Sequence, residues 1–282
     1  MTNRFAVIGS PISHSKSPIL HESAFRVLGL SDQYSAVDVA ATRLRQFVET
    51  LDGSWKGLSV TMPLKEEAAR FASRRDAIVD ITGVANTLNL EGGQWVAYNT
   101  DVFGIQQALQ APLSKQGAKV LIIGSGATAS SAVFSALLAN SSAQVTLVAR
   151  DRRKVLALRE RAKTHGFRIR AKGMRSVTRA AAKSDIVITT LPSHGIDDIA
   201  EKLGKNKFFK PRGSLLDVSY EPWPSEIAKL WRSHEKTTVS GLEMLIFQAI
   251  AQLRIFHLGA SNEALPNERA VELAMRDSLG LI

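Results

Sequence analysis

The sequence contains no cysteine, few aromatic residues and no long apolar run. Zero cysteines among 282 residues exclude a disulfide scaffold, a thiolate metal site and a cysteine nucleophile, and they fit a reducing cytoplasm. The apolar run Phe5–Ile8 is too short for the core of a signal peptide. The most apolar late stretch, Leu242–Phe256, is interrupted by charged residues and glutamines, so it predicts no membrane span. We therefore expect a cytoplasmic protein without a membrane partner.

Net charge is the one unusual property of the composition. Apolar residues make up 45% and charged residues 22%, as in ordinary folded proteins, but 36 Lys and Arg against 26 Asp and Glu leave a net charge of +10. Such an excess is typical of a nucleic-acid-binding protein or of an enzyme that handles anionic ligands. Only 6% of the residues are aromatic, and basic and aromatic residues do not alternate, so we expect no nucleic-acid partner.

The positive charge is concentrated in one segment. Between Arg150 and Lys183 there are 13 Lys and Arg and only two acids, so this segment carries +11. The remaining chain has 23 basic and 24 acidic residues and carries −1. The charge is therefore a local feature, which we interpret as a mostly solvated face that attracts an anionic ligand.

The first 110 residues combine apolar β-type runs with helical patterns. Helices are expected at Pro18–Leu28, at about Thr42–Leu51 and after Pro63. Two runs flank Glu91-Gly92-Gly93, which predicts a hairpin. The predicted strands are Phe5–Gly9, Tyr34–Val39, Leu58–Thr61, Thr87–Leu90 and Trp95–Tyr98.

The chain from about Lys119 has continuous apolar runs that alternate with helical segments, which predicts a doubly wound parallel sheet. A connector rich in helix breakers, residues 111–117, separates it from the first part, and the chain after Gly241 is helical. The strands expected here are Val120–Ile123, Val145–Val148, Ile186–Thr190 and Leu215–Val218, with helices at about Thr128–Leu138, Arg152–His165 and Pro224–Arg232.

A glycine-rich turn follows the first of these strands and opens a helix. Its pattern is G-x-G-x-x-A, in which the two glycines allow a tight turn and close approach of a pyrophosphate to the helix N-terminus. The alternative is a purely structural turn. The strand–turn–helix context favours a dinucleotide site made of Gly124, Ser125, Gly126, Ala127, Thr128 and Ala129.

The end of the next strand indicates which dinucleotide binds. NAD-specific units place an acid there for the ribose 2′-hydroxyl, whereas Arg150 follows Ala149 here and suits a 2′-phosphate. Asp151 complicates this interpretation, although it can instead cap the following helix. We expect NADP as the cofactor.

Three polar segments of the first part are candidates for substrate chemistry. The loop that contains Ser15 and Ser17 precedes a helix, so it predicts either an anion site or a helix cap. Lys65 lies one turn beyond a strand end, where it is either a cleft residue or a solvated lysine. Asp101 follows the second of two Asn-Thr pairs and could cap a helix or pair with Lys65.

Together these segments resemble the shikimate dehydrogenase family over nearly the whole chain. Several separate motifs in the right order carry the resemblance: GSPISHSKSPILH at 9–21, SVTMPLK at 59–65, GVANTL at 83–88, NTD at 99–101, GSGATA at 124–129 and GLEMLIFQA at 241–249.

The resemblance implies an α/β protein of two domains, with residues 1–110 completed by 242–282 as the substrate domain and 111–241 as an inserted Rossmann-type NADP domain. It implies NADP-dependent reduction of 3-dehydroshikimate to shikimate in chorismate and aromatic amino-acid biosynthesis, without a metal, by a monomer or homodimer. The implied catalytic residues are Lys65 and Asp101. The implied substrate contacts are Ser15 and Ser17 to the carboxylate, Tyr220 near it, and Thr61, Lys65, Asn86, Asp101 and Gln248 to the ring hydroxyls.

Val218 and Gly241 resemble positions that line the nicotinamide. The sequence departs from the family pattern at two places, Ser59 for a frequent asparagine and Ala149-Arg150-Asp151 for a frequent Asn-Arg-Thr. The second departure leaves open a paralogue that uses quinate and NAD. Ser15 and Ser17 favour shikimate, since threonine in place of one of them accompanies quinate use in the family.

Overall fold

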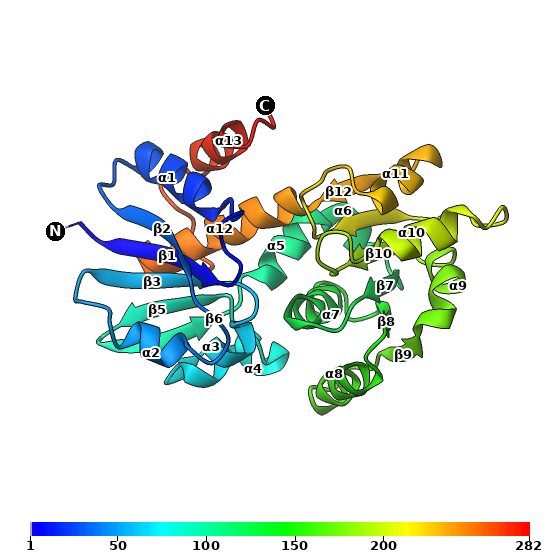
Figure 1. Ribbon diagram of the computed structural model, residues 1–282, viewed down its shortest axis with the longest axis horizontal. Helices are drawn as coiled ribbons and strands as arrows, with labels where there is room; N and C mark the ends of the chain where they lie inside the picture. Colours follow the sequence, from blue (N-terminus) through cyan, green and yellow to red (C-terminus); the bar gives the residue numbers. More distant parts are fainter. Residues whose placement is uncertain (1) are drawn as a thin grey trace. The chain divides into compact units, whose positions relative to one another are not determined.

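The computed structural model describes residues 2–282, which form two compact units. The first unit contains residues 2–104 and 245–282, and the second contains Ile105–Met244. Each unit has its own six-stranded sheet with helices packed against it (Figure 1). The prediction of a two-domain α/β protein is confirmed.

The first unit is built on a mixed sheet with the strand order β2-β1-β3-β5-β6-β4. Strands β1, β2 and β3 are parallel, whereas β5 is antiparallel to both β3 and β6. The predicted hairpin forms between β5 and β6, and both of its turn glycines have positive φ angles. The strand bounds are β1 (Arg4–Gly9), β2 (Gln33–Asp38), β3 (Trp55–Val60), β4 (Arg74–Arg75), β5 (Thr87–Glu91) and β6 (Gln94–Tyr98).

Alternation along β1 divides the core of this unit between the two faces of the sheet. Phe5 and Val7 pack with α1 (Ser17–Leu28), α12 (Gly241–Leu258) and α13 (Glu268–Ser278). Ala6 and Ile8 belong to the other core, which α2 (Leu44–Val48), α3 (Lys65–Phe71) and α4 (Ala77–Thr82) cover. The C-terminal helices thus complete the core of the unit that the N-terminal residues begin.

The second unit has a fully parallel sheet with the order β12-β11-β10-β7-β8-β9. This is the doubly wound order of dinucleotide-binding folds, and it reverses between β7 and β10, where ligands of such sheets bind. The strand bounds are β7 (Lys119–Ile123), β8 (Gln144–Ala149), β9 (Arg170–Gly173), β10 (Ile186–Thr189), β11 (Ser214–Asp217) and β12 (Thr238–Ser240).

Some elements of the chain were not expected from the sequence. The edge strands β4, β9 and β12 and the short helices α4, α9 and α10 were missed, and α6 begins one residue before the expected connector 111–117 and overlaps it. The remaining helices are α5 (Asp101–Ala108), α6 (Gln110–Leu113), α7 (Ala127–Ala139), α8 (Arg152–Thr164), η1 (Met174–Ser176), α9 (Val177–Ala181), α10 (Asp197–Gly204) and α11 (Glu226–Ser233).

Candidate active site

Three polar segments meet at one edge of the first sheet. Thr61 follows β3, Asn86 precedes β5, and Asp101 follows β6. Because β5 is antiparallel to both of its neighbours, its N-terminal end lies beside the C-terminal ends of β3 and β6. Sheet topology therefore brings together residues that are up to 40 positions apart in the sequence.

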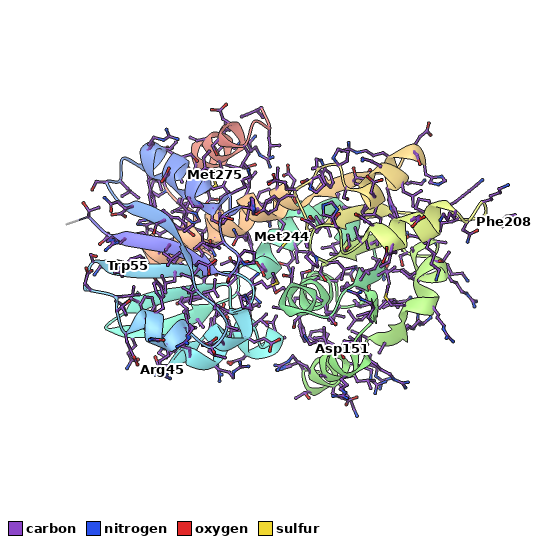
Figure 2. All side chains as sticks on the ribbon, viewed as in Figure 1. Arg45, Trp55, Asp151, Phe208, Met244 and Met275 are labelled. Atoms are coloured by element: carbon purple, nitrogen blue, oxygen red, sulfur yellow. The ribbon has the colours of Figure 1, made fainter. Side chains whose placement is uncertain are left out.

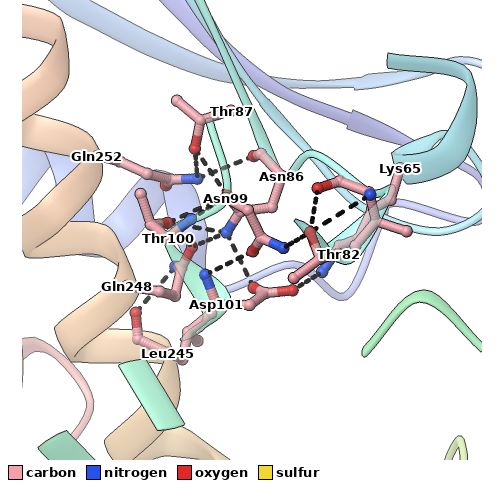
Figure 3. A network of polar contacts seen from close by, with 11 residues as sticks. Lys65, Thr82, Asn86, Thr87, Asn99, Thr100, Asp101, Leu245, Gln248 and Gln252 are labelled. Atoms are coloured by element: carbon pink, nitrogen blue, oxygen red, sulfur yellow. Dashed lines mark hydrogen bonds and ion pairs between the residues drawn. The ribbon is translucent and has the colours of Figure 1, made fainter. Parts of the chain in front are cut away.

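Lys65 and Asp101 form an ion pair at this edge, with the lysine Nζ 2.5 Å from Asp101 Oδ2 (Figure 3). Each is the first residue of a helix, Lys65 of α3 and Asp101 of α5. Their side chains are only 12% and 4% exposed, so little water screens the attraction between them. Of the two possibilities that the sequence left open for Asp101, the pair with Lys65 is the one that forms.

Asn86 connects this pair to α12, the first of the two C-terminal helices. Its amide Nδ2 donates to Asp101 Oδ1 at 2.9 Å and to Thr100 Oγ1 at 2.8 Å, and it lies 3.1 Å from Gln248 Oε1. Its Oδ1 accepts the Thr100 N–H at 2.8 Å. Both oxygens of Asp101 thus have a donor, one from Asn86 and one from Lys65, which fixes the orientation of the carboxylate.

Asn99 holds the start of α5 in place. Its Oδ1 accepts the N–H of Asp101 at 3.1 Å, and its Nδ2 donates to Thr82 Oγ1 at 3.0 Å. Figure 3 shows Asn99, Thr100 and Asp101 arranged around Asn86. The sequence signal for this arrangement was the repeated Asn-Thr pair, although the function of Asn99 was not recognised from it.

A second buried chain of hydrogen bonds supports Asn86 from the side of the core. Gln252, one turn after Gln248 on α12, donates from Nε2 to the Asn86 carbonyl at 3.1 Å. Its Oε1 accepts from Ser59 Oγ at 2.8 Å, and Ser59 accepts from the Tyr34 hydroxyl at 2.6 Å. Burial raises the pKa of Tyr34, so this hydroxyl remains a donor. Ser59, a departure from the family pattern, is thus a member of this supporting chain.

The two candidate serines lie at the start of α1, in the same unit. Ser15 is half-buried in the loop after β1, and its Oγ accepts the N–H of Ser17, the first residue of α1, at 3.3 Å. The loop leaves β1 next to Thr61, because a Cβ on Gly9 would come within 2.4 Å of the Thr61 methyl group. The Thr61 N–H donates to the Ile8 carbonyl at 2.9 Å, so the ends of β1 and β3 are adjacent.

In the second unit, the glycine-rich turn joins β7 to α7. Gly124 has φ +131°, and a Cβ there would lie 2.1 Å from Thr190 Oγ1, so only glycine fits. Gly126 precedes the first turn of α7, which contains the predicted residues Ala127–Ala129, and no side chain of residues 2–282 caps the start of the helix. A Cβ on Gly126 would meet no described atom within 4 Å. The uncapped N–H groups at this end suit a pyrophosphate.

A cavity of about 390 Å³ lies beside this turn, lined by Gly124 and Ser125 and by residues that follow β8, including Arg150. Asp151 Oδ1 accepts the N–H groups of Arg153 at 2.9 Å and Lys154 at 3.2 Å, which confirms its interpretation as the cap of α8. Asp151 is labelled beside α8 in Figure 2. Lys154 and Lys202 also line the cavity and were not singled out in the sequence. Both cations were indistinguishable in sequence from the many solvated lysines around them.

The remaining candidates lie in the loop after β11 and at the first residue of α12, which follows β12 directly. A Cβ on Gly241 would come within 2.1 Å of the Val218 carbonyl, so these two positions are adjacent and the second requires glycine. Tyr220 is half-buried in the loop after β11. The buried Asp217 carboxylate holds this loop by accepting from Ser225 Oγ at 2.6 Å, and burial raises the pKa of Asp217.

The doubly wound sheet with its glycine turn, joined to a unit that holds a buried lysine–aspartate pair, defines a two-domain dinucleotide-dependent dehydrogenase. Residues 7–88 match the family model described as the shikimate dehydrogenase substrate binding domain, and residues 106–220 match that of shikimate / quinate 5-dehydrogenase. The chain belongs to the shikimate dehydrogenase family.

Individual relatives agree with this assignment over nearly their full length. A protein from Ignicoccus hospitalis named shikimate dehydrogenase (NADP(+)) is 33% identical over 257 residues, which cover 91% of this chain and 94% of the relative. The crystal structure of Mycobacterium tuberculosis shikimate dehydrogenase has a TM-score of 0.84 at 33% identity, covering 98% of this chain and 99% of that chain. Shikimate 5-dehydrogenase from Thermus thermophilus, solved with NADP(H) and shikimate, has a TM-score of 0.80 at 25% identity, covering 98% and 100%.

Proposed function

We propose that this protein catalyses the reversible NADP-dependent reduction of 3-dehydroshikimate to shikimate, a step of chorismate and aromatic amino-acid biosynthesis. The observation that carries the proposal is the Lys65–Asp101 pair, buried among amide and hydroxyl side chains in the substrate-binding part of a shikimate dehydrogenase family member. A cationic amine in such surroundings is suited to polarise a carbonyl oxygen and to return a proton to it.

Each substrate group has a matching partner in this proposal. The hydroxyls of Ser15 and Ser17, with Tyr220, bind the carboxylate of the substrate. The ring oxygens are bound by side chains of the buried network: Thr61, Lys65, Asn86, Asp101 and Gln248. Because Lys65 Nζ has three hydrogens and gives one to Asp101, it can direct another at the reacting oxygen. Asp101 accepts one N–H of Lys65 and so orients the amine for transfer of another proton to the reacting oxygen.

The second unit fits NADP. The open space at Gly126 and the uncapped start of α7 accommodate a pyrophosphate, and Arg150 at the end of β8 suits a 2′-phosphate. Val218 and Gly241 are proposed to line the nicotinamide. NADPH supplies the hydride when it is bound, and the residues of this chain bind, orient and protonate.

The decisive experiment measures oxidation rates with shikimate and with quinate, each with NADP and with NAD, on the purified chain. We expect the highest kcat/KM for shikimate with NADP. A higher kcat/KM for quinate with NAD would instead assign the chain to the quinate-using branch, and no turnover with any pair would refute the proposal. Arg150→Ala should weaken NADP more than NAD, because only NADP has the 2′-phosphate.

Location and assembly remain sequence-based proposals: a cytoplasmic enzyme, monomeric or homodimeric, without a nucleic-acid partner. None of the helices in residues 2–282 is long and apolar enough to cross a membrane. Filter binding with DNA and RNA at low and moderate salt tests the last proposal, since phosphate-driven binding would be strong at low salt and fall steeply as salt rises.

A further inference from the structure

Two cavities of the second unit meet at Arg150. The first, of about 390 Å³, lies at the glycine turn, and the second, of about 700 Å³, lies between α8 and β9. Ala149, Arg150 and Met174 line both. Arg150 follows the end of β8, where the adenosine ribose of a dinucleotide binds in such folds. It therefore borders two cavities whose other lining residues differ.

The two cavities differ in charge. The first is lined by two carboxylates, Asp151 and Asp198, and by three cations, Arg150, Lys154 and Lys202. The second has no carboxylate among the side chains of residues 2–282 that line it, and four of its lining side chains are cationic: Arg150, Arg152, Arg159 and Lys172. A dianionic group is therefore favoured more strongly in the second cavity, where four cations face no carboxylate, than in the first, where two carboxylates offset part of the positive charge.

Three of these four cations have no ion-pair partner among residues 2–282: Arg150, Arg152 and Lys172. Arg159 pairs with Glu160. Unpaired cations that surround a concave space are available to a phosphate, whose three acceptor oxygens can take charge-assisted hydrogen bonds from several donors at once.

The register of β9 brings Lys172 to the end of β8. Lys172 lies beside Val148, and Gly173 lies beside Ala149, the residue before Arg150. Arg152 approaches from the other side, as the first residue of α8. Lysine and arginine from a strand and a helix that are about twenty residues apart thus flank the same strand end.

On these observations, and resting on the proposed function, we propose that Lys172 and Arg152 determine cofactor specificity together with Arg150. The 2′-phosphate of NADP enters the cavity between α8 and β9, while the adenine occupies the cavity beside the glycine turn. Asp151, whose carboxylate is engaged as the cap of α8, then borders the adenine side and not the phosphate.

The test uses ligands that lack nicotinamide, so that it is independent of turnover. Calorimetric titration compares 2′,5′-ADP with 5′-AMP on the wild-type chain, Lys172→Gln, Arg152→Gln and the control Arg168→Gln, which removes an exposed cation that lines neither cavity. We expect each of the first two variants to weaken 2′,5′-ADP about tenfold, the usual scale of a charged hydrogen bond, and to leave 5′-AMP unchanged. The control should change neither.

Two results would overturn the inference: unchanged affinity for 2′,5′-ADP in both variants, or equal losses for 2′,5′-ADP and 5′-AMP. Equal losses would show that the two cations only contribute to the overall positive electrostatic potential of the protein and do not bind the 2′-phosphate. Failure of the proposed function is recognised separately, because a chain that binds 2′,5′-ADP as expected but does not oxidise shikimate would retain the phosphate site and lose only the assigned reaction.

Discussion

Lys65 is a charged amine in a network that almost excludes water, with Asp101 as its ion-pair partner. Lys65→Ala should lower kcat by about 100-fold or more with little change in KM, on the scale observed when a positioned acid–base group is removed. Steady-state kinetics with shikimate and NADP measure this. Lys56→Ala is the matched control, since Lys56 donates to the Gly53 carbonyl near the opposite end of β3. Near-normal turnover of Lys65→Ala would remove Lys65 from the mechanism.

His21 is fully buried on α1, where its ring stacks on Tyr34 with a centroid distance of 3.9 Å. Burial lowers the pKa of His21 from 6.5 to about 4, so the native state keeps it neutral where the unfolded chain already takes up a proton. The free energy of unfolding should therefore fall as the pH falls from 6.5 towards 4, by about 3 kcal/mol from this residue.

Urea unfolding at neutral pH and at mildly acidic pH measures the His21 effect. The comparison variant is His21→Asn, which does not titrate and retains a donor on the side of the Ser17 carbonyl, to which Nδ1 lies 3.0 Å away. Its unfolding free energy should depend less on pH than that of the wild type. Some dependence should remain, because burial also lowers the pKa of His257. Equal pH dependence in both chains would contradict the assignment.

The sequence indicated the residues of the candidate site better than it indicated the buried residues that hold them in place by hydrogen bonds. Lys65, Asn86 and Asp101 belong to compact motifs, and their functional assignment remains a prediction. Gln252 and Tyr34 were not expected, because their contacts depend on tertiary packing alone: the bond between Ser59 and Gln252 joins residues 193 positions apart. No local pattern distinguishes such a glutamine from one on a solvated helix face.

At the level of elements, the turn between β7 and α7 contains two glycines for which we expect different functions: Gly124 is required by the fold, and Gly126 leaves space for the cofactor. Gly124→Ala should lower the thermal stability of the chain, since its Cβ would collide with Thr190 at a positive φ. Gly126→Ala should leave stability nearly unchanged, since space surrounds that position, and should weaken NADP by filling the space proposed for the pyrophosphate.

Thermal unfolding and NADP titration of both glycine variants test this distinction. The two variants act as controls for each other, because each adds the same methyl group within one turn. If both variants lost NADP affinity equally and neither lost thermal stability, the two glycines would not have the different functions that we expect. A loss of stability in Gly126→Ala would show that this glycine too is required by the fold.

Helices and strands that are marked by a local apolar pattern in the sequence were predicted, and those that depend on contacts with distant residues were not. β7, β8 and β10 are interior strands with continuous apolar runs, whereas the edge strand β9 has the sequence Arg-Ala-Lys-Gly and no such run. The helix expected at Thr42–Leu51 spans only Leu44–Val48. Thr42 has a positive φ. Glu67 of the neighbouring helix α3 accepts the N–H groups of Thr42 and of Leu44, the first residue of α2, a long-range cap that the local pattern could not show.

At the scale of the whole molecule, the positive charge is confined to one unit. The segment from Arg150 to Lys183, which carries +11, lies entirely within the second unit and comprises α8, β9, η1 and α9. At most a few of its cations can contact one phosphate. The others contribute a positive potential that raises the local concentration of an anionic ligand, an effect that salt screens.

This distribution predicts that salt distinguishes the two cofactors. The screening length falls from about 10 Å at 0.1 M salt to about 3 Å at 1 M, so the KM for NADP should rise several-fold across that range. The KM for NAD should rise less, because NAD lacks the dianionic 2′-phosphate. Steady-state kinetics with shikimate and each cofactor measure both slopes, and Arg150→Ala should reduce the difference between them. Parallel slopes in the wild-type chain would mean that the basic segment acts on the shared pyrophosphate, and its position beside β8 would then need another explanation.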